Sequence, residues 1–435
     1  MMKYYFLRLS LLLATVFPWP VCGQQPPAGA ITLATVWEQA EAGNRQISLQ
    51  QQELAGSAEK VLAARDTRLP SVNVDGSYSR LSNMPLYTDG ILHAPTQFPV
   101  SHEHYTAGGN LYFNLYNGGK TTREIAMAKA EQSISATKLQ GSVADIRYQA
   151  AVYFLDLYRY QQFRTLLEQD IRSSELQLSE IKQLYKNGLV LKSDVLREEV
   201  KISNQRLSLT EINNNIAIHT QRLHYLMGRP DTGAIYPIVE LPEVAGPAPD
   251  TSSHEAIEYK LALKNTSLGA LRLDQVKANP LPKLGFFADY RYTYPQTAYY
   301  PYSRVPWSGG QAGFSVSVPV SSFYQNRHKT REARMAWQQQ LTIAASVQDN
   351  LRQEIHAAFL HYQEALQQTT VARNNMLQAT ESLRILRSSY FNQQSLLSDL
   401  LDAETQLLQS KFNLTTAMVK VQVQHYQLLR LTGKI

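Results

Sequence analysis

The sequence is poor in cysteine and in long apolar runs. It contains a single cysteine, Cys22, so the chain has no intramolecular disulfide. Beyond an apolar run at 9–17, no stretch of about 18 apolar residues remains, which excludes a membrane-spanning helix in that part. Only 18% of the residues are charged, and the lysines and arginines are scattered rather than clustered. This charge distribution argues against a nucleic-acid partner.

The first 23 residues have the features of a secretory signal peptide. Lys3 and Arg8 precede the apolar run, helix-breaking prolines follow it, and a small-residue site ends at Gly23. We expect cleavage before Gln24, which removes Cys22. Lipidation of Cys22 is the alternative, although the residues at 19–21 are a poor approach to an acylated cysteine. The chain is therefore expected to be exported.

A series of apolar residues spaced seven apart occurs twice in the chain. A shift of 205 positions superimposes the two series and carries Ser193-Asp194 onto Ser398-Asp399. A seven-residue apolar period is typical of coiled coils, and two copies with matching ends indicate a duplicated helical unit. The first series is Val195, Ile202, Leu209, Ile216 and Leu223, and the second is Leu400, Leu407, Leu414, Val421 and Leu428.

Each repeat, 24–230 and 254–435, is expected to contain one very long helix and two shorter ones. The long helices are predicted at about 119–187 and 324–391, which corresponds to about 100 Å each. Two short helices stacked end to end beside a long one predict a rod of uniform thickness. A segment rich in proline and glycine, 231–253, links the repeats and is expected beside the middle of the rod. The short helices are predicted at about 32–68, 193–227, 254–281 and 395–432.

Four segments alternate strictly between apolar and polar residues, which predicts strands with one apolar and one polar face. Their lengths suit tilted transmembrane strands, and nearby tyrosines are typical of a membrane interface. An ordinary half-buried sheet is the alternative. Four strands cannot close a barrel, so transmembrane strands would require an oligomer that shares one barrel. The segments are about 71–80, 108–116, 283–292 and 312–320, and the tyrosines are Tyr78, Tyr112, Tyr116, Tyr290, Tyr292, Tyr294, Tyr299, Tyr300 and Tyr302.

The order of several short motifs resembles TolC-like outer membrane efflux proteins over nearly all of the chain after the signal peptide. The resemblance implies a mixed α and β fold, in which a long α-helical coiled-coil barrel joins a transmembrane β-barrel shared between protomers, four strands each. It also implies a homotrimer in the outer membrane of a Gram-negative bacterium, with a periplasmic helical extension. The motifs include Leu69-Pro70, Leu281-Pro282, Thr122-Arg123-Glu124, Thr330-Arg331-Glu332 and the tip sequence Asn187-Gly188-Leu189-Val190.

The resemblance assigns a gate and a docking tip. Asp399 and Asp402 match the family's periplasmic gate, and their spacing of three places both carboxylates on one helical face. An ordinary solvated pair is the alternative. Gly188, Leu189 and Val190 form an apolar turn that is expected to dock the periplasmic adaptor, because exposed apolar groups usually indicate a partner. A turn packed within the chain is the alternative.

The resemblance also assigns a lock that holds the closed state. Ser193, Asp194 and Tyr390 match the positions of this lock, whereas Ser395 stands where the family often has an arginine. We therefore expect a Tyr390–Asp194 hydrogen bond without a charge-assisted partner. A charged hydrogen bond contributes about 1.5–3 kcal/mol, so a gate that lacks one is expected to open more easily.

These features predict the exit duct of a tripartite efflux system, with a periplasmic adaptor (membrane fusion protein) and an inner-membrane pump as partners. The exit duct of a type I protein secretion system and a non-conducting periplasmic coiled-coil protein are the alternatives. We expect no enzyme, cofactor or metal. The loop at 117–121 lacks the first glycine of a phosphate-binding motif. His102 and His104 lie in an expected loop at 81–106, with Glu103 between them and no cysteine nearby, and are expected to be solvated loop residues rather than metal ligands.

Overall fold

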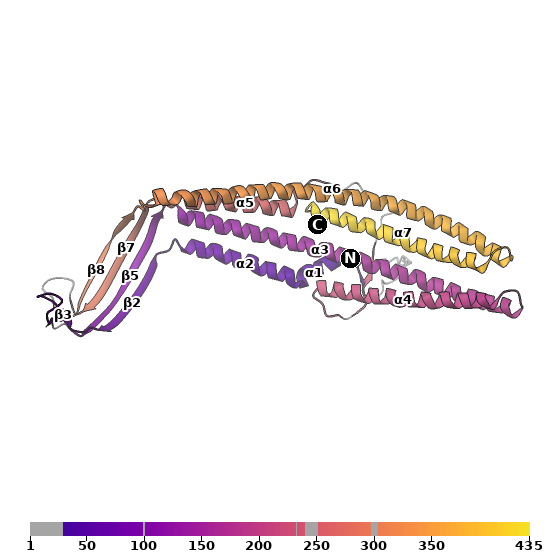
Figure 1. Ribbon diagram of the computed structural model, residues 1–435, viewed down its shortest axis with the longest axis horizontal. Coiled ribbons are helices and arrows are strands. Elements are labelled where there is room, and N and C mark those ends of the chain that lie inside the picture. Colours follow the sequence, from indigo (N-terminus) through magenta and orange to yellow (C-terminus); the bar gives the residue numbers. More distant parts are fainter. Residues whose placement is uncertain (1–28, 99–100, 232, 240–250, 297–302) are drawn as a thin grey trace, which may run out of the picture.

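The computed structural model describes residues 29–98, 101–231, 233–239, 251–296 and 303–435. The molecule is a long rod of helices with a four-stranded sheet at one end (Figure 1). The predicted signal peptide, the alternative of a lipidated Cys22, most of the predicted linker and Tyr299, Tyr300 and Tyr302 lie outside the described residues. Within the described ranges, every helix is too short or too polar to cross a membrane.

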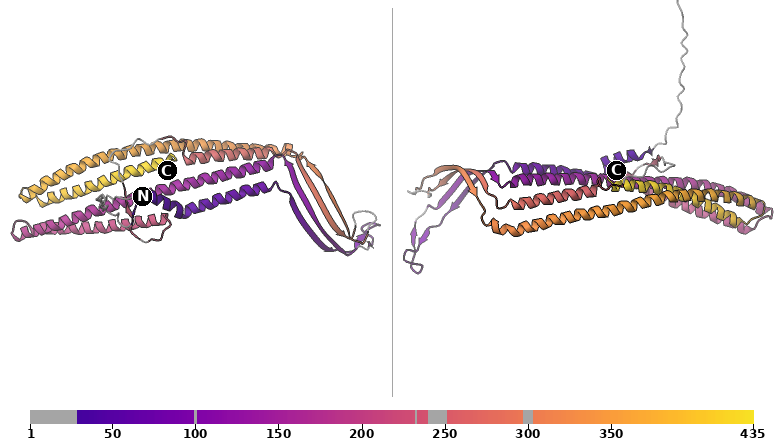
Figure 2. Two further views of the ribbon diagram at one scale, coloured as in Figure 1. Left: turned by 180° about the vertical axis from the view of Figure 1, so that it is seen from behind. Right: turned by 90° about the horizontal axis from the view of Figure 1, so that it is seen from above.

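Two long helices run the length of the rod, and shorter helices accompany each of them. The helix α2 lies beside the half of α3 near the sheet, and α4 lies beside the other half (Figures 1 and 2). The helices α5 and α7 accompany α6 in the same way. The helices are α1 (Leu33–Gly43), α2 (Arg45–Asp66), α3 (Lys120–Lys186), α4 (Lys192–Leu226), α5 (Ile257–Lys277), α6 (Ser322–Phe391) and α7 (Leu397–Leu431).

The helix predicted at about 32–68 is wrong in one respect, because it breaks at Asn44. The Asn44 side-chain oxygen accepts a hydrogen bond from the Gln46 backbone N–H at 2.9 Å, which caps α2. Its side-chain nitrogen donates to the last carbonyl of α4, Leu226, at 3.2 Å. Gly43 is required beside it, since a Cβ there would lie 2.1 Å from the Met227 carbonyl oxygen. The hydrogen bond from Asn44 therefore connects the end of α4 to the point where α1 and α2 meet.

The sheet is antiparallel in the order β2-β5-β7-β8, so β2 and β8 are its edges. Its strands are β2 (Ser71–Arg80), β5 (Glu103–Asn117), β7 (Lys283–Tyr294) and β8 (Trp307–Ser317). The strands predicted at about 108–116 and 312–320 begin five residues earlier. The added residues show no apolar alternation, but those of β5 pair with β2 and β7, and those of β8 pair with β7. The strand β8 also ends before Pro319, which has no N–H to donate.

The two faces of the sheet differ in polarity. Val72, Val74 and Tyr78 lie on one face of β2 and are exposed, Val74 by 85%. On the other face Asp75, Gly108 and Arg291 are in register across three strands. The Arg291 guanidinium reaches over the side-chain-free Gly108 and donates to both Asp75 oxygens, at 2.9 and 3.3 Å. One face is therefore apolar and unpartnered, and the other carries hydrogen-bonded polar groups.

Short strands occupy the far end of the sheet and the middle of the rod. The segment 81–106, which we expected to be a loop, contains β3 (Met84–Leu86), β4 (Thr96–Phe98) and the start of β5. In the middle of the rod β1 (Ala30–Ile31) pairs in parallel with β6 (Tyr236–Pro237). The largest apolar core lies nearby, around Phe154 and Leu157 of α3.

Candidate functional site

The helical hairpins end in two turns of the same shape. Hairpin 1 is α3 with α4, and hairpin 2 is α6 with α7. Gly188 follows α3 with a φ of 72°, and Gln393 follows α6 with a φ of 61°. In each turn the N–H of this residue bonds a carbonyl of the preceding helix at 2.9 Å. Gln393 is the one non-glycine residue with a positive φ in the described part of the chain.

An apolar cluster beneath the turns joins the two hairpins. Val190, one of the three residues predicted to dock an adaptor, is half-buried against this cluster. Gly188 and Leu189 are exposed, Leu189 by 55%. Leu191 and Leu396 are more exposed still, at 71% and 69%, and sequence reasoning missed both. The cluster consists of Ile181, Val195, Tyr390, Leu397 and Leu400, with Leu178, Val190, Leu383 and Leu401 packed against it.

Two of the predicted lock residues, Tyr390 and Asp194, make no hydrogen bond to each other in this structure. The Tyr390 side chain is buried, and its hydroxyl has no hydrogen-bond partner among the described residues. Burial raises the pKa of Tyr390, and the charges of Asp194 and Glu198 raise it further. The Asp194 carboxylate accepts from the Leu191 backbone N–H at 3.2 Å instead, and so caps its own helix. The expected Tyr390–Asp194 hydrogen bond is therefore not formed here, and Ser193 is exposed.

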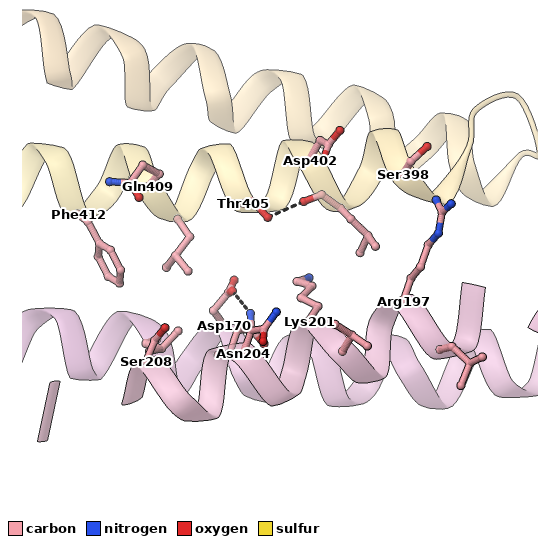
Figure 3. A pocket seen from close by; sticks show the side chains of 16 residues that line it. Asp170, Arg197, Lys201, Asn204, Ser208, Ser398, Asp402, Thr405, Gln409 and Phe412 are labelled. Atoms are coloured by element: carbon pink, nitrogen blue, oxygen red, sulfur yellow. Dashed lines mark hydrogen bonds between the residues drawn. The ribbon is translucent and has the colours of Figure 1, made fainter. Parts of the chain in front are cut away.

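The two predicted gate carboxylates are exposed. Asp399 lies in the first turn of α7, where the Ser398 hydroxyl donates to it at 3.4 Å, and Asp402 follows one turn later. The described residues provide neither carboxylate with an ion pair. Asp402 lines a groove of about 720 Å³ between α4 and α7, and Arg197 lines its opposite wall (Figure 3). Both carboxylates are thus available to solvent or to another copy of the chain.

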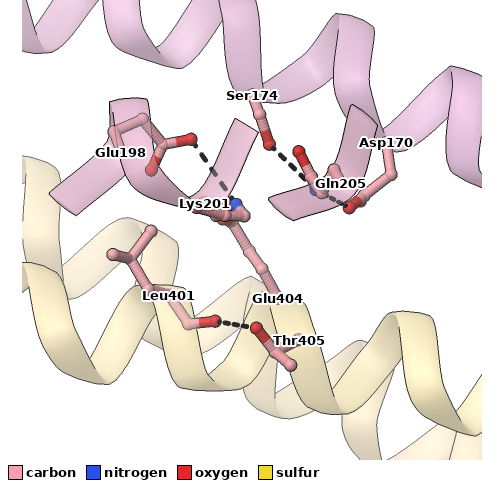
Figure 4. A network of polar contacts seen from close by, with 8 residues as sticks. All are labelled: Asp170, Ser174, Glu198, Lys201, Gln205, Leu401, Glu404 and Thr405. Carbon is pink, nitrogen blue, oxygen red and sulfur yellow. Dashed lines mark hydrogen bonds and ion pairs between the residues drawn. The ribbon is translucent and has the colours of Figure 1, made fainter. Parts of the chain in front are cut away.

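A polar network that sequence reasoning missed lies along the same groove (Figure 4). Lys201 of α4 forms an ion pair with Glu404 of α7, and its ammonium nitrogen is 3.5 Å from Glu198 Oε1. Gln205 of α4 donates to Asp170 of α3 at 2.6 Å. Burial raises the pKa of Glu198 and of Asp170, and the charge of Lys201 opposes the shift in both. The network connects the two hairpins near their tips.

The described residues contain no group of three or more His, Cys, Asp or Glu side chains that could hold a metal ion. The Leu81 carbonyl oxygen lies 3.0 Å from His102 Nδ1 and accepts a hydrogen bond from it in the tautomer that carries the proton on Nδ1.

Comparisons with known proteins agree on the fold. Residues 36–229 match the family model of outer membrane efflux proteins. No curated protein matches. The outer-membrane channel OprN is 16% identical with a TM-score of 0.77, and the match covers 93% of this chain and 90% of that one.

Two further solved structures are similar. CusC, studied for transmembrane channel formation, is 14% identical with a TM-score of 0.78 over 92% of each chain. The outer membrane protein VceC from Vibrio cholerae is 15% identical with a TM-score of 0.75, over 92% of this chain and 96% of that one. These identities are low enough that the likeness shows the fold alone. The chain is a helix-rich mixed α and β protein with this fold, and the efflux family model matches its residues 36–229. The resemblance to TolC-like outer membrane efflux proteins is therefore confirmed.

Proposed function

We propose that this chain is one protomer of a homotrimeric outer-membrane channel, the exit duct of a tripartite efflux system. In this role the channel is a passive conduit, opened at its hairpin tips by a periplasmic adaptor and supplied by an inner-membrane pump. The observation that carries the proposal is the open sheet at the end of the rod, with one apolar face, one polar face and two unpaired edges.

The edges of the sheet require partners. The strands β2 and β8 each pair on one side within the described residues. In lipid, each unpaired backbone N–H or C=O group costs several kcal/mol. Identical copies can supply the missing bonds if β8 of one copy pairs with β2 of the next, which closes a shared barrel. The exposed apolar residues Val74, Phe314 and Val316 then face lipid.

Three copies suit a duct better than two. Two copies provide about eight strands, whose interior is filled by side chains, whereas three provide about twelve and leave a passage. The polar face would line this passage, including the Asp75–Arg291 ion pair and Asp289. The two repeats, 24–230 and 254–435, then contribute two strands each to every protomer.

The hairpin tips form the gate in this proposal. In a trimer Asp399 and Asp402 together contribute about six carboxylates to one narrow aperture, which favours cations. Their exposure and their lack of an ion pair within the described chain support this role. Ser193, Asp194 and Tyr390 remain the proposed lock, which in this structure has not engaged.

The same tips are the proposed docking site for the adaptor. Leu189, Leu191 and Leu396 are exposed at the end of a long polar rod. Apolar groups exposed in this way usually mark a protein interaction site. Gly188 and Val190 complete the turn, although Val190 also packs against the cluster beneath it. The exposed leucines are therefore the residues that would meet the adaptor first.

Planar-bilayer recordings of the detergent-extracted protein test this proposal. We expect a trimer on chemical crosslinking, and a cation-selective channel whose selectivity falls in the Asp399→Ala/Asp402→Ala double variant. A channel indifferent to these substitutions would retain the duct and move the gate elsewhere. A soluble, non-conducting protein would overturn the proposal in favour of a structural coiled coil. The class of transporter that copurifies with the crosslinked channel separates efflux from type I protein secretion.

A further inference from the structure

A half-buried lysine links the two hairpins about two helical turns from the predicted lock. The Lys201 side chain is 14% exposed, and that of its ion-pair partner Glu404, on the other hairpin, is 11% exposed. The Glu198 side chain is fully buried, and Lys201 is its ion-pair partner among the described residues. One ammonium group thus faces two carboxylates, one from its own helix and one from the other hairpin (Figure 4).

We propose that Lys201 is a clasp that holds hairpin 1 against hairpin 2, and that Glu198 weakens this clasp by competing for the same ammonium group. This inference rests on the proposed function, because the clasp acts only if the hairpins separate when the duct opens. Glu198 lies three residues from Lys201 on α4, so their ion pair adds nothing to the contact between hairpins. The pair with Glu404 of α7 is the one that crosses.

The surroundings make Glu198 the carboxylate that controls the clasp. On α3, Asp170 accepts from Gln205 and makes no ion pair with Lys201 within the described chain. On α7, Lys411 acts on Asp170 through its charge. Asp402 of α7 and Arg197 of α4 line the adjoining groove. Burial disfavours the charge of Glu198, and the Lys201 ammonium and the Ser174 hydroxyl oppose this effect. When Glu198 takes up a proton, Lys201 is left to Glu404 alone.

This arrangement predicts a dependence on pH with a definite sign. Burial raises the pKa of Glu198 above its ordinary value, and the charge of Glu404 adds to the shift, while Lys201 opposes it. As the pH falls through this raised pKa, Glu198 becomes neutral and the clasp tightens. The channel is therefore expected to open less readily on mild acidification.

The same substitution at the two carboxylates separates the clasp from a merely structural role. Glu404→Gln removes the charge that crosses between hairpins, and we expect about a tenfold higher open probability, as for the loss of one charged hydrogen bond. Glu198→Gln removes the competitor, so open probability should fall and its response to mild acid should disappear. Lys201→Met should resemble Glu404→Gln. Glu175→Gln is the matched control, because Glu175 pairs with the exposed Arg206 within hairpin 1 and is expected to change nothing.

A distance measurement provides a readout besides conductance. Asn204 and Gln409 are exposed on the two walls of the groove, and their replacement by cysteine in a chain without Cys22 allows two spin labels to be attached (Figure 3). We expect Glu404→Gln to lengthen the distance between the labels and Glu198→Gln to narrow its distribution. If the wild type does not conduct, the proposed function fails and the spin-label distance still decides the clasp. If the wild type conducts but both variants shift in one direction, or neither shifts, the clasp is overturned.

Discussion

The two hairpins have matching bounds but different interiors. The helices α4 and α7 begin and end at positions related by the shift of 205, and so do the ends of α3 and α6. However, the residues that follow each member of the apolar series by three positions differ between the two hairpins. In α4 all five of these residues are large and three of them are polar, whereas in α7 three of the five are small. The α4 residues are Glu198, Gln205, Ile212, His219 and Leu226, and the corresponding α7 residues are Ala403, Ser410, Ala417, Gln424 and Leu431.

The long helices differ in the same sense. Large residues of α3 correspond under the same shift to alanines of α6. Because the separation of packed helices depends on the side chains between them, hairpin 2 suits close approach and hairpin 1 a wider spacing. The apolar series thus determines that a hairpin forms, and the neighbouring column determines which groups it presents to the other hairpin. The corresponding residues are Tyr153, Tyr160 and Leu167 in α3, and Ala358, Ala365 and Ala372 in α6.

Exchanging one pair of corresponding residues tests this difference with the largest expected effect. Leu167→Ala empties a buried site packed against Ile171 and Ile212, and should lower the free energy of unfolding by about 2–5 kcal/mol. Ala372→Leu should cost about 1–3 kcal/mol by overpacking the narrow hairpin. Urea unfolding of the full chain in detergent measures both. A neutral Ala372→Leu variant would contradict the close spacing of hairpin 2.

The two turns provide a second exchange. Gln393 adopts the left-handed conformation that costs a residue with a Cβ about 1–2 kcal/mol, and Gly188 adopts the same conformation without that cost. Gln393→Gly should therefore raise the free energy of unfolding by about 1 kcal/mol. Gly188→Gln should lower the free energy of unfolding by a similar amount. The strain of the left-handed φ is the whole cost there, since no atom lies within 4 Å of a Cβ built at Gly188. Thermal unfolding compares the pair, and equal effects of one sign would mean that the turns are not equivalent.

Asp194 and Asp399 correspond under the same shift but make different contacts. Asp194→Ala removes the hydrogen bond to the Leu191 N–H and should cost about 0.5–1.5 kcal/mol of stability. Asp399→Ala is expected to change stability by less than about 0.5 kcal/mol, because its carboxylate is exposed. For cation selectivity in planar bilayers we expect the reverse order, with a larger loss in Asp399→Ala than in Asp194→Ala. A loss of selectivity in Asp194→Ala alone would assign the gate to hairpin 1.

Local periodicity predicted much of the fold because a helix or a strand is encoded in adjacent residues. The segment 71–80 is the strand β2, and the helix expected at about 395–432 is α7, Leu397–Leu431. Periodicity failed where a distant partner decides the structure. Asn44 breaks a helix because of a bond to Leu226, and the starts of β5 and β8, which lack apolar alternation, become strands by pairing with neighbouring strands.

The candidate site shows the same limit. Resemblance located the gate, lock and tip residues, and their roles stay predictions. The Lys201–Glu404 pair joins residues 203 positions apart, and nothing local in either helix indicates it. A signal was nevertheless present, because Glu198 opens the column of residues at 198, 205, 212, 219 and 226 that follows the apolar series in α4. A charged residue in a buried column requires a partner, and Lys201 lies three residues further along the same helix.

The smallest effect concerns acid stability and separates His219 from its counterpart Gln424. His219 is buried, with its ring centroid 5.4 Å from that of Tyr160. Burial lowers the pKa of His219; the charges of Arg222 and Arg159 also lower it, and Asp156 opposes them. The stability that neutral His219 contributes is complete above the ordinary histidine pKa of about 6.5, and is lost as the pH falls through the lowered value.

We therefore expect His219→Gln to reduce the loss of unfolding free energy between about pH 7 and pH 5. The reverse change, Gln424→His, should add acid sensitivity to hairpin 2. The comparison is best made in the Glu198→Gln background, because Glu198 has a raised pKa and acts in the opposite sense, losing stability as the pH rises. If His219→Gln and Gln424→His each lose as much stability on acidification as their parent does, the acid response does not come from positions 219 and 424. The difference between the hairpins would then be one of packing alone.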